Sequence, residues 1–263
     1  MYKLALLFLV IFICVSFAVA QEDYHKFEVA GGYSYERVKG FPGDTLTSTS
    51  TFGTSTTGAS RTHNLNGFNA AAVYNFSKYF GAKVEFSGNN GSDTNHDLPG
   101  GTYQSLNGFT ILVIPGESGI AAKQRDYKFI GGVQFKDNST EKRLKPFAHA
   151  LFGTSRQTTD FYNLDQQRTN LIGGSKKINA NSLTMAFGGG LDVRVSKRID
   201  IRVIQFDYNP VFVKQKTLVA LNSRVDSLVT SFSGGSTVTA LQSVEVPKHT
   251  QQNFRFGFGI VFH

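Results

Sequence analysis

The last ten residues of the chain alternate large apolar residues with glycine or polar ones up to the C-terminus. Successive side chains of a β-strand point to opposite faces, so this alternation predicts a strand with one entirely apolar face. That face comprises Phe254, Phe256, Phe258, Ile260 and Phe262. Arg255, Gly257 and Gly259 fall on the other face, and only Val261 breaks the alternation. A terminal strand of this kind predicts lipid on its apolar side and a polar or tightly packed interior on the other.

An export signal is predicted at the other end of the chain. A positively charged start is followed by the apolar run Leu4–Val15 and by the small-residue cleavage site Ala18–Ala20. We therefore expect residues 1–20 to be removed and the mature chain to begin at Gln21. A retained anchor helix is the alternative, although the apolar run is short for a membrane span. Cleavage would remove Cys14, the single cysteine, so stability must come from a source other than disulfides.

The composition agrees with an all-β chain. It contains 27 Gly, 24 Phe and 10 Tyr but only 2 Met and no Trp, and residues 21–263 have the length of one all-β domain. Beyond the signal, the segment that comes nearest to a membrane helix is Phe109–Ile114, which Pro115 ends before it could span a membrane. The formal net charge of +8 is scattered along the chain. This distribution excludes a nucleic-acid patch and favours attraction to the anionic phosphates of lipopolysaccharide.

Period-two alternation predicts eight strands. They are Lys26–Val38, Asn66–Phe76, Tyr79–Ser87, Arg125–Lys136, Pro146–Ser155, Leu183–Val195, Arg198–Tyr208 and Phe254–His263. The pattern does not decide which face of Pro146–Ser155 is apolar. The alternation slips after Val203, which predicts a bulge or a membrane boundary there.

The connections between these strands fall into two groups. Three are short, whereas Lys39–Asn64, Gly88–Gln124, Arg156–Ser182 and Asn209–Thr250 are long and polar, with Thr45–Ser60 almost entirely Ser, Thr and Gly. Short turns at one end and long loops at the other are typical of an outer-membrane barrel. The expected fold is therefore an all-β, transmembrane, antiparallel up-and-down β-barrel of eight strands, with long extracellular loops, short periplasmic turns and both termini in the periplasm. Ten strands stay open as an alternative, because Gly108–Ile114 and Leu218–Val229 could pair as further strands or simply extend hairpins above the membrane.

The signal, the eight strands and the aromatic final strand together resemble the small outer-membrane barrels of the OmpA/OmpX type. Two segments, Pro146–Gly153 and Gly188–Arg202, resemble more closely the outer membrane β-barrel domain proteins of acidobacteria-like Gram-negative bacteria. The resemblance implies a location in the cell outer membrane, and the wider family supports structural, adhesive and pore roles alike. His263 departs from the pattern, since an aromatic ring usually ends such chains.

Charged residues on the inward faces of the predicted strands form the candidate site. They are Glu28, Glu36, Lys83, Glu85, Lys128, Asp192, Arg194, Asp200, Arg202 and Arg255. An eight-stranded lumen is only wide enough for side chains to fill it, and mixed charges there predict ion pairs. The set is interpreted as a polar core that holds the barrel together. The alternative interpretation is a gated ion path that opens when the pairs exchange partners.

Catalytic and metal sites are not predicted. Small barrels that act on lipid use a His and a Ser, and His149 with Ser155 would be the candidates, but a single His on a strand of undecided facing is weak support. His25, His63, His96 and His249 lack metal-ligand spacing. Gly188–Gly190 begins no helix and therefore forms no phosphate loop. We expect neither an enzyme nor a cofactor.

Two classes of function follow from the sequence. The first is a structural, adhesive or surface-interaction protein that acts through its long loops, and the second is a small passive pore for ions or small solutes. A lipid-modifying enzyme is the third and least favoured alternative. The expected partners are outer-membrane lipids and lipopolysaccharide, and the outer-membrane assembly machinery through the C-terminal strand, whereas no nucleic acid is expected and the ligand of the loops is open.

Overall fold

The computed structural model describes residues 24–50, 53–105, 111–139, 142–162, 164–165, 169, 172–220, 224–225 and 238–263. The predicted signal, residues 1–20, lies outside these ranges. No helix in the described ranges is long and apolar enough to cross a membrane.

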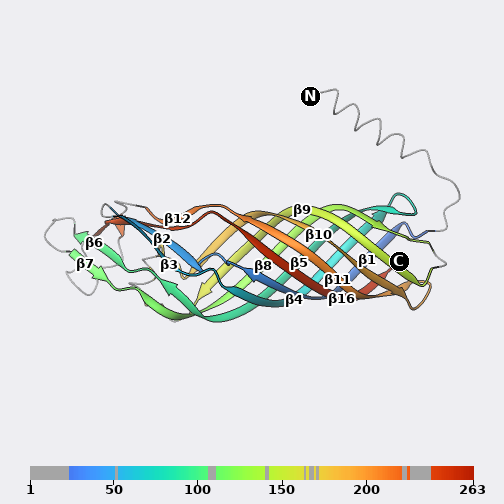
Figure 1. The fold of residues 1–263 in the computed structure, drawn as a ribbon, viewed down its shortest axis with the longest axis horizontal. Helices are drawn as coiled ribbons and strands as arrows, with labels where there is room; N and C mark the ends of the chain where they lie inside the picture. The colour runs from blue at the N-terminus through green and yellow to red at the C-terminus, as the bar shows by residue number, and fades with distance from the viewer. Residues whose placement is uncertain are drawn as a thin grey trace, which may run out of the picture.

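Eight antiparallel strands close into a barrel (Figure 1). In chain order they are β1 (Phe27–Lys39), β4 (Thr62–Asn75), β5 (Phe80–Leu98), β8 (Glu117–Lys136), β9 (Leu144–Phe161), β10 (Lys177–Arg194), β11 (Ile199–Val213) and β16 (His249–Phe262). Each pairs with its neighbours in the chain, and β16 closes the wall by pairing with both β1 and β11. The predicted eight-stranded, up-and-down barrel is confirmed, and full closure leaves its wall no free edge.

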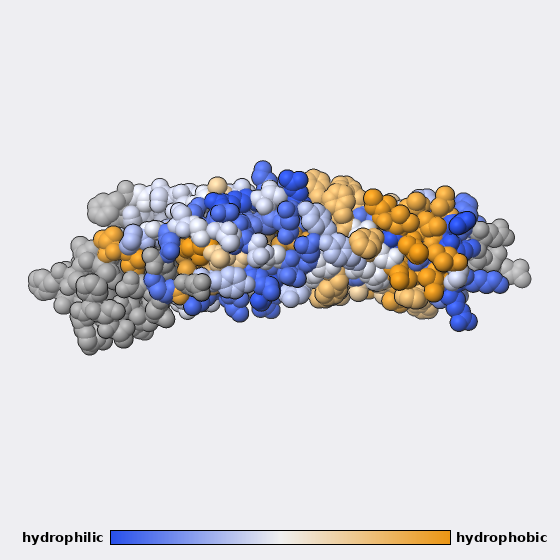
Figure 2. Space-filling view, turned by 90° about the horizontal axis from the view of Figure 1, so that it is seen from below, coloured by the Kyte–Doolittle hydropathy of each residue, from blue (hydrophilic) through white to orange (hydrophobic). Residues whose placement is uncertain are grey.

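Alternation along the strands gives this wall an apolar belt. Side chains of the predicted outward faces are exposed, such as Phe27 and Tyr33 on β1, and on β9 Phe152, whose facing was undecided, is 71% exposed. All five apolar residues of the C-terminal strand face outward, whereas Val261 is fully buried against Ala30 and Ala71. On the face that Figure 2 shows, the belt is a band across the part of the barrel near the short turns. A lipid-facing band of this kind is the hallmark of transmembrane barrels.

The strands continue well beyond the belt. β8 has 20 residues and β5 has 19, whereas about 9–11 residues suffice to cross a bilayer. In this upper barrel the polarity of the two faces is reversed: Lys177 of β10 points outward while Ile178 and Phe161 are buried inside. The buried apolar cluster there draws on most of the strands and includes Leu98, Ile120, Val211 and Val246. The long segments predicted as loops are therefore largely β-structure built around a core of their own.

Two small four-stranded sheets, together called the crown, lie at this end of the barrel. The first has the order β12 (Lys216–Val219), β15 (Gln242–Val246), β2 (Thr45–Ser50) and β3 (Gly53–Gly58). The second has the order β13 (Arg224–Val225), β14 (Val238–Ala240), β6 (Gly101–Ser105) and β7 (Ile111–Ile114). The Ser/Thr/Gly-rich segment Thr45–Ser60, predicted as a loop, is thus mostly a hairpin. The two candidate extra strands contribute β7, β12 and β13 to the crown and none to the barrel, so the ten-strand alternative is wrong; residues 108–110, 221–223 and 226–229 lie outside the described ranges.

Two local features that the sequence pattern left open are the irregularity in β11 and the facing of β9. The register between β11 and β16 shifts between Arg202 and Gln205, which confirms the bulge predicted after Val203. Val203 and Ile204 both face outward as a result. On β9, Lys145, Phe147 and His149 face inward. The facing that the pattern left undecided is therefore fixed by pairing with β8 and β10.

Candidate functional site: the filled lumen

Nine of the ten predicted lumen charges are buried inside the barrel, none more than 4% exposed. Arg194 is the exception. It is half-buried at the short-turn end and donates a hydrogen bond to the backbone carbonyl of Ser139 at 2.9 Å. Its assignment to the lumen is corrected to the rim, because β10 ends at this residue. The other nine lie in three layers along the barrel axis.

The layer nearest the short turns links four strands. Lys136 pairs with both Glu28 and Asp192 at 2.9 Å. The Arg202 guanidinium donates two hydrogen bonds, of 2.8 and 3.1 Å, to the Asp192 carboxylate. Its guanidinium also stacks over the Phe147 ring with 4.3 Å to the centroid. Because bidentate pairing and stacking use both the edge and the face of the guanidinium, Arg202 is held rigidly in the lumen.

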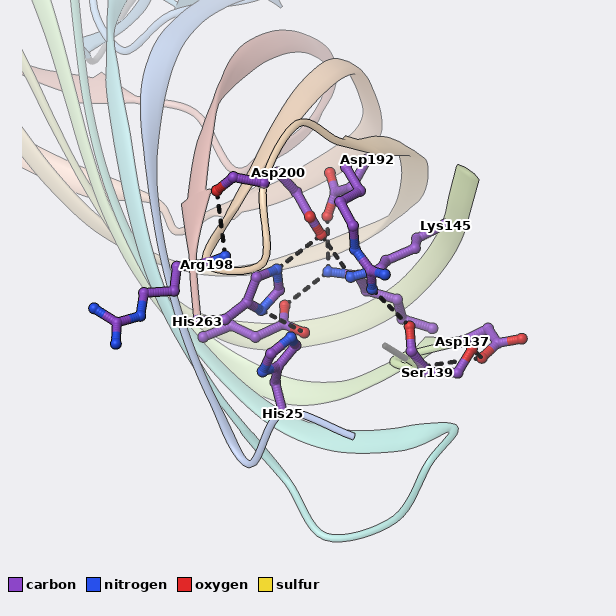
Figure 3. Close-up of polar contacts among 12 residues, drawn as sticks. His25, Asp137, Ser139, Lys145, Asp192, Arg198, Asp200 and His263 are labelled. Carbon is purple, nitrogen blue, oxygen red and sulfur yellow. Dashed lines mark hydrogen bonds and ion pairs between the residues drawn. The ribbon is translucent and has the colours of Figure 1, made fainter. Parts of the chain in front are cut away.

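The C-terminal residue closes this layer toward the short turns (Figure 3). The His263 side chain turns inward, stacks on His25 at 4.3 Å and contacts Asp200 at 2.8 Å. Lys145 reaches the same carboxylate at 2.8 Å. The departure of His263 from the expected terminal aromatic thus has a structural reason, since an inward position at the end of β16 meets a buried carboxylate rather than lipid.

The central layer is built around Arg255. Its guanidinium pairs with Glu85 and, at 2.5 Å, with Asp207. Lys83 contacts Glu85 at 2.8 Å, and His149 contacts Asp207 at 2.9 Å. Gly188, directly opposite Asp207 in the register, leaves room for that carboxylate, which explains a glycine there without invoking phosphate binding.

The third layer lies toward the upper barrel. Lys128 pairs with Glu36, and with Asp126 at 3.1 Å. Ser155 and the Gln157 amide donate to the Asp126 carboxylate at 2.7 and 3.1 Å. Each charge in the three layers thus has a partner of opposite sign, as burial in a narrow lumen requires.

A short plug, Gly40–Asp44, covers the third layer from above. Phe41 is buried and meets the His63 ring edge-on at 6.0 Å. The Asp44 carboxylate accepts from the backbone N–H of Phe41 at 2.8 Å and contacts His63 at 2.8 Å. The carbonyl of Gly40 accepts from Gln251 at 2.7 Å. Gly43 makes the turn with φ of +98°, a backbone conformation that favours glycine.

Sequence reasoning missed several members of the layers. Asp126 and Lys136 share the inward parity of Lys128, so extending that pattern along the strand would have found them. His263 likewise shares the parity of Arg255. Asp207 was hidden by the bulge, which changes the parity after Val203.

The candidate catalytic pair is not assembled. His149 contacts Asp207 and Lys83, whereas Ser155 donates to Asp126. Six residues of extended strand place the two side chains about 20 Å apart. Both are buried in the lumen. Within the described ranges no group of His, Cys, Asp and Glu side chains could hold a metal ion.

Acid is expected to loosen the plug. Burial lowers the pKa of the His96 imidazole, while Asp44 and Asp93 partly oppose this effect and the stacked His63 ring, 5.8 Å away, adds to it. An opened plug would expose His96 at its ordinary pKa of about 6.5, so the open state binds more protons and gains population as the pH falls below that value. Amide hydrogen exchange at Gly40, Phe41, Gly43 and Asp44, corrected for the intrinsic rate, should therefore accelerate between pH 7 and pH 5. His96→Gln should reduce this dependence, whereas His25→Gln at the opposite end should not; equal protection at both pH values in the wild type would contradict the expectation.

Comparisons with known proteins concern the fold. No protein-family model and no curated protein matches the sequence. Among solved structures, the chain is similar to the outer membrane protein OprG from Pseudomonas aeruginosa, with 13% identity, 92% of this chain and 98% of that chain covered, and a TM-score of 0.45. It is also similar to Ail, the attachment invasion locus protein of Yersinia pestis, in complex with the heparin analogue sucrose octasulfate, with 13% identity, coverage of 90% and 100%, and a TM-score of 0.40. Neisserial surface protein A gives 10% identity, coverage of 92% and 99%, and a TM-score of 0.39.

The fold is that of a small outer-membrane β-barrel. The closed strand pairing and the apolar belt define this fold. It confirms the predicted OmpA/OmpX-type architecture. The closer resemblance to the acidobacteria-like barrel domain proteins stays a prediction.

Proposed function

We propose that the protein is an exported, integral outer-membrane barrel that presents a rigid surface outside the cell. In the proposed orientation, the short turns and the end of β16 would lie on the periplasmic side, and the upper barrel and crown outside the cell. The outward aromatic face of β16 is the segment that the assembly machinery would read. Outer-membrane lipids, lipopolysaccharide among them, would surround the belt.

The observation that carries the proposed role is the reversal of polarity along the strands. A barrel that only spans a membrane has no need of a second, apolar core beyond the belt, whereas a structure that must stay folded in water does. Polar outer walls and a two-sheet crown provide a large, stiff contact surface. The protein is thus best suited to a structural or adhesive role, with no catalytic step.

The filled lumen argues against the alternative of a passive pore. The predicted charges pair across the barrel and leave no space of water width beside Lys83, Glu85 or Arg255, all about 1% exposed. The plug and the apolar cluster lie above them in series. Moving an ion through would require separating several buried pairs at once, at a cost of several kcal/mol for each uncompensated charge, roughly.

Planar-bilayer recording tests this directly. The refolded mature chain, residues 21–263, should insert without producing steady channels, because its lumen is closed at successive levels. Heat-modifiable gel migration would confirm that the silent sample is folded. Reproducible single-channel currents that change in Arg202→Gln would support the pore instead.

The contact role needs a test of the crown itself. Cells that display the full chain should adhere to surfaces or to one another more than cells that display a variant with the β2–β3 hairpin shortened to a tight turn. Equal surface levels, measured with an antibody against an upper-barrel epitope, are the control. Unchanged adhesion would contradict the contact role, and altered lipid A or phospholipid profiles on overexpression would favour a lipid-modifying enzyme.

A further inference from the structure

An open polar groove of about 470 Å³ lies on the outer wall, across β4, β5 and β8. Its lining includes Asn64, Asn66, Asn90, Ser92, Lys123 and Tyr162. Asn64, Asn66 and Asn90 are on the outward face of their strands, so the groove opens sideways and away from the lumen. It therefore belongs to none of the buried layers described above.

Two tyrosines orient the amides of this groove. The Tyr35 hydroxyl donates to the carboxamide oxygen of Asn64 at 2.8 Å, and Tyr33 donates in the same way to Asn66. With the oxygens engaged, the two amide nitrogens have no acceptor among the described residues. Each can donate two hydrogen bonds to a ligand in the groove. Neighbouring carboxamides of this kind suit hydroxyl and phosphate oxygens.

The groove also carries an uncompensated positive charge. Lys123 has no carboxylate within ion-pair distance among the described residues. The nearby Asp160 instead forms ion pairs with Arg125 at 3.6 Å and with Lys177 at 3.4 Å. Arg37, exposed and directly opposite Asn64 in the register of β1 and β4, adds a second cation at the rim. The groove thus favours an anionic ligand.

The position of the groove restricts the ligand further. An aromatic surface lies directly beneath it, where the rings of Phe68 and Tyr127 flank Gly88 and Phe86 stacks on Tyr127 at 6.4 Å. These rings belong to the upper edge of the apolar belt. A molecule that occupies both surfaces needs a polar, anionic head and an apolar tail on the same side of the barrel.

We propose that this groove binds the phosphorylated sugar headgroup of an outer-leaflet glycolipid. Lys123 and Arg37 contact its phosphate, Asn64 and Asn66 its hydroxyl groups, and the acyl chains run down over Phe68 and Tyr127. The inference rests on the proposed outer-membrane location. It gives the barrel a fixed lipid on one side, next to the strands that carry the crown.

Binding of defined lipids to the folded mature protein in detergent tests the proposal. Bisphosphorylated, hexa-acylated lipid A should bind at one site, as counted by native mass spectrometry, and its dephosphorylated form should bind more weakly. Lys123→Gln should weaken binding of the phosphorylated form about tenfold, the loss expected for one charge-assisted hydrogen bond to phosphate. Asn66→Ala should also weaken binding of both forms. The matched control is Lys214→Gln, which removes an exposed lysine just beyond the end of β11, away from the groove.

Three results would overturn the proposal. If Lys123→Gln and Lys214→Gln bound the phosphorylated lipid A with equal affinity, the groove would not be the binding site. Equal binding of the phosphorylated and dephosphorylated forms would show that the groove does not recognise the phosphate. Binding of the free, de-acylated phosphosugar as tight as that of the lipid would assign the groove to a soluble saccharide. A protein that inserts into phospholipid bilayers but fails these tests keeps the proposed function and loses only this inference.

Discussion

Replacing Arg255 with alanine should lower the free energy of unfolding by about 3–5 kcal/mol, the cost of leaving a buried charge without its partner. Arg255 is the only cation that contacts both Glu85 and Asp207 within the described ranges, and all three side chains are buried. Without it, two carboxylates face each other in the lumen with only Lys83 and His149 to compensate. The carboxylates of Glu85 and Asp207 would then repel each other, and the central layer would no longer hold the strands together.

Urea unfolding in detergent or lipid, followed by far-UV circular dichroism and gel migration, measures this loss. Tryptophan fluorescence is no option, since the chain has no Trp. Arg198→Ala is the matched control, because Arg198 is exposed in the short turn between β10 and β11 and its loss should stay within about 0.5 kcal/mol. A cost below about 1 kcal/mol for Arg255→Ala would mean that the central layer is not a stabilising core.

Phe258→Lys should destabilise the inserted barrel by about 2–4 kcal/mol, as expected for a lysine at the bilayer midplane. Phe258 is the middle residue of the five outward side chains of β16 and is 58% exposed, with its ring 5.2 Å from that of Tyr33. A lysine here must bring its ammonium into hydrocarbon or bend toward a distant interface. The effect depends on the belt lying in lipid, so it tests the orientation of the whole barrel.

The matched control is Phe212→Lys on β11. Phe212 is 38% exposed, and its neighbours Val211 and Val213 belong to the apolar core of the upper barrel, which places it beyond the belt. Lysine there should cost about 0–1 kcal/mol. Reversible unfolding from phospholipid vesicles compares the two variants, and equal costs would contradict the assigned position of the belt.

The sequence alone predicted much of the lower barrel. Period-two alternation is a local property, so it identified the outward face of β16 and the inward Glu28, Lys83 and Arg202 without knowledge of strand pairing. It also predicted the bulge after Val203, because a slip in alternation is visible in a single strand. It failed for Pro146–Ser155, where apolar residues occupy both faces and only the neighbouring strands decide.

In the upper barrel, alternation no longer predicts which face of a strand points inward. The alternation of β10 continues unbroken from Phe187 to Lys177, but the polar and apolar faces exchange sides, so a rule that assigns apolar residues to the outside no longer applies. Which face is inside is a property of the closed wall and of the medium around it. The sequence by itself determined the strands and their alternation. Only the tertiary structure decided which charges pair across the lumen, that Gly40–Asp44 closes it, and that Asn64, Asn66 and Lys123 share one groove, because these contacts join residues from strands far apart in the chain.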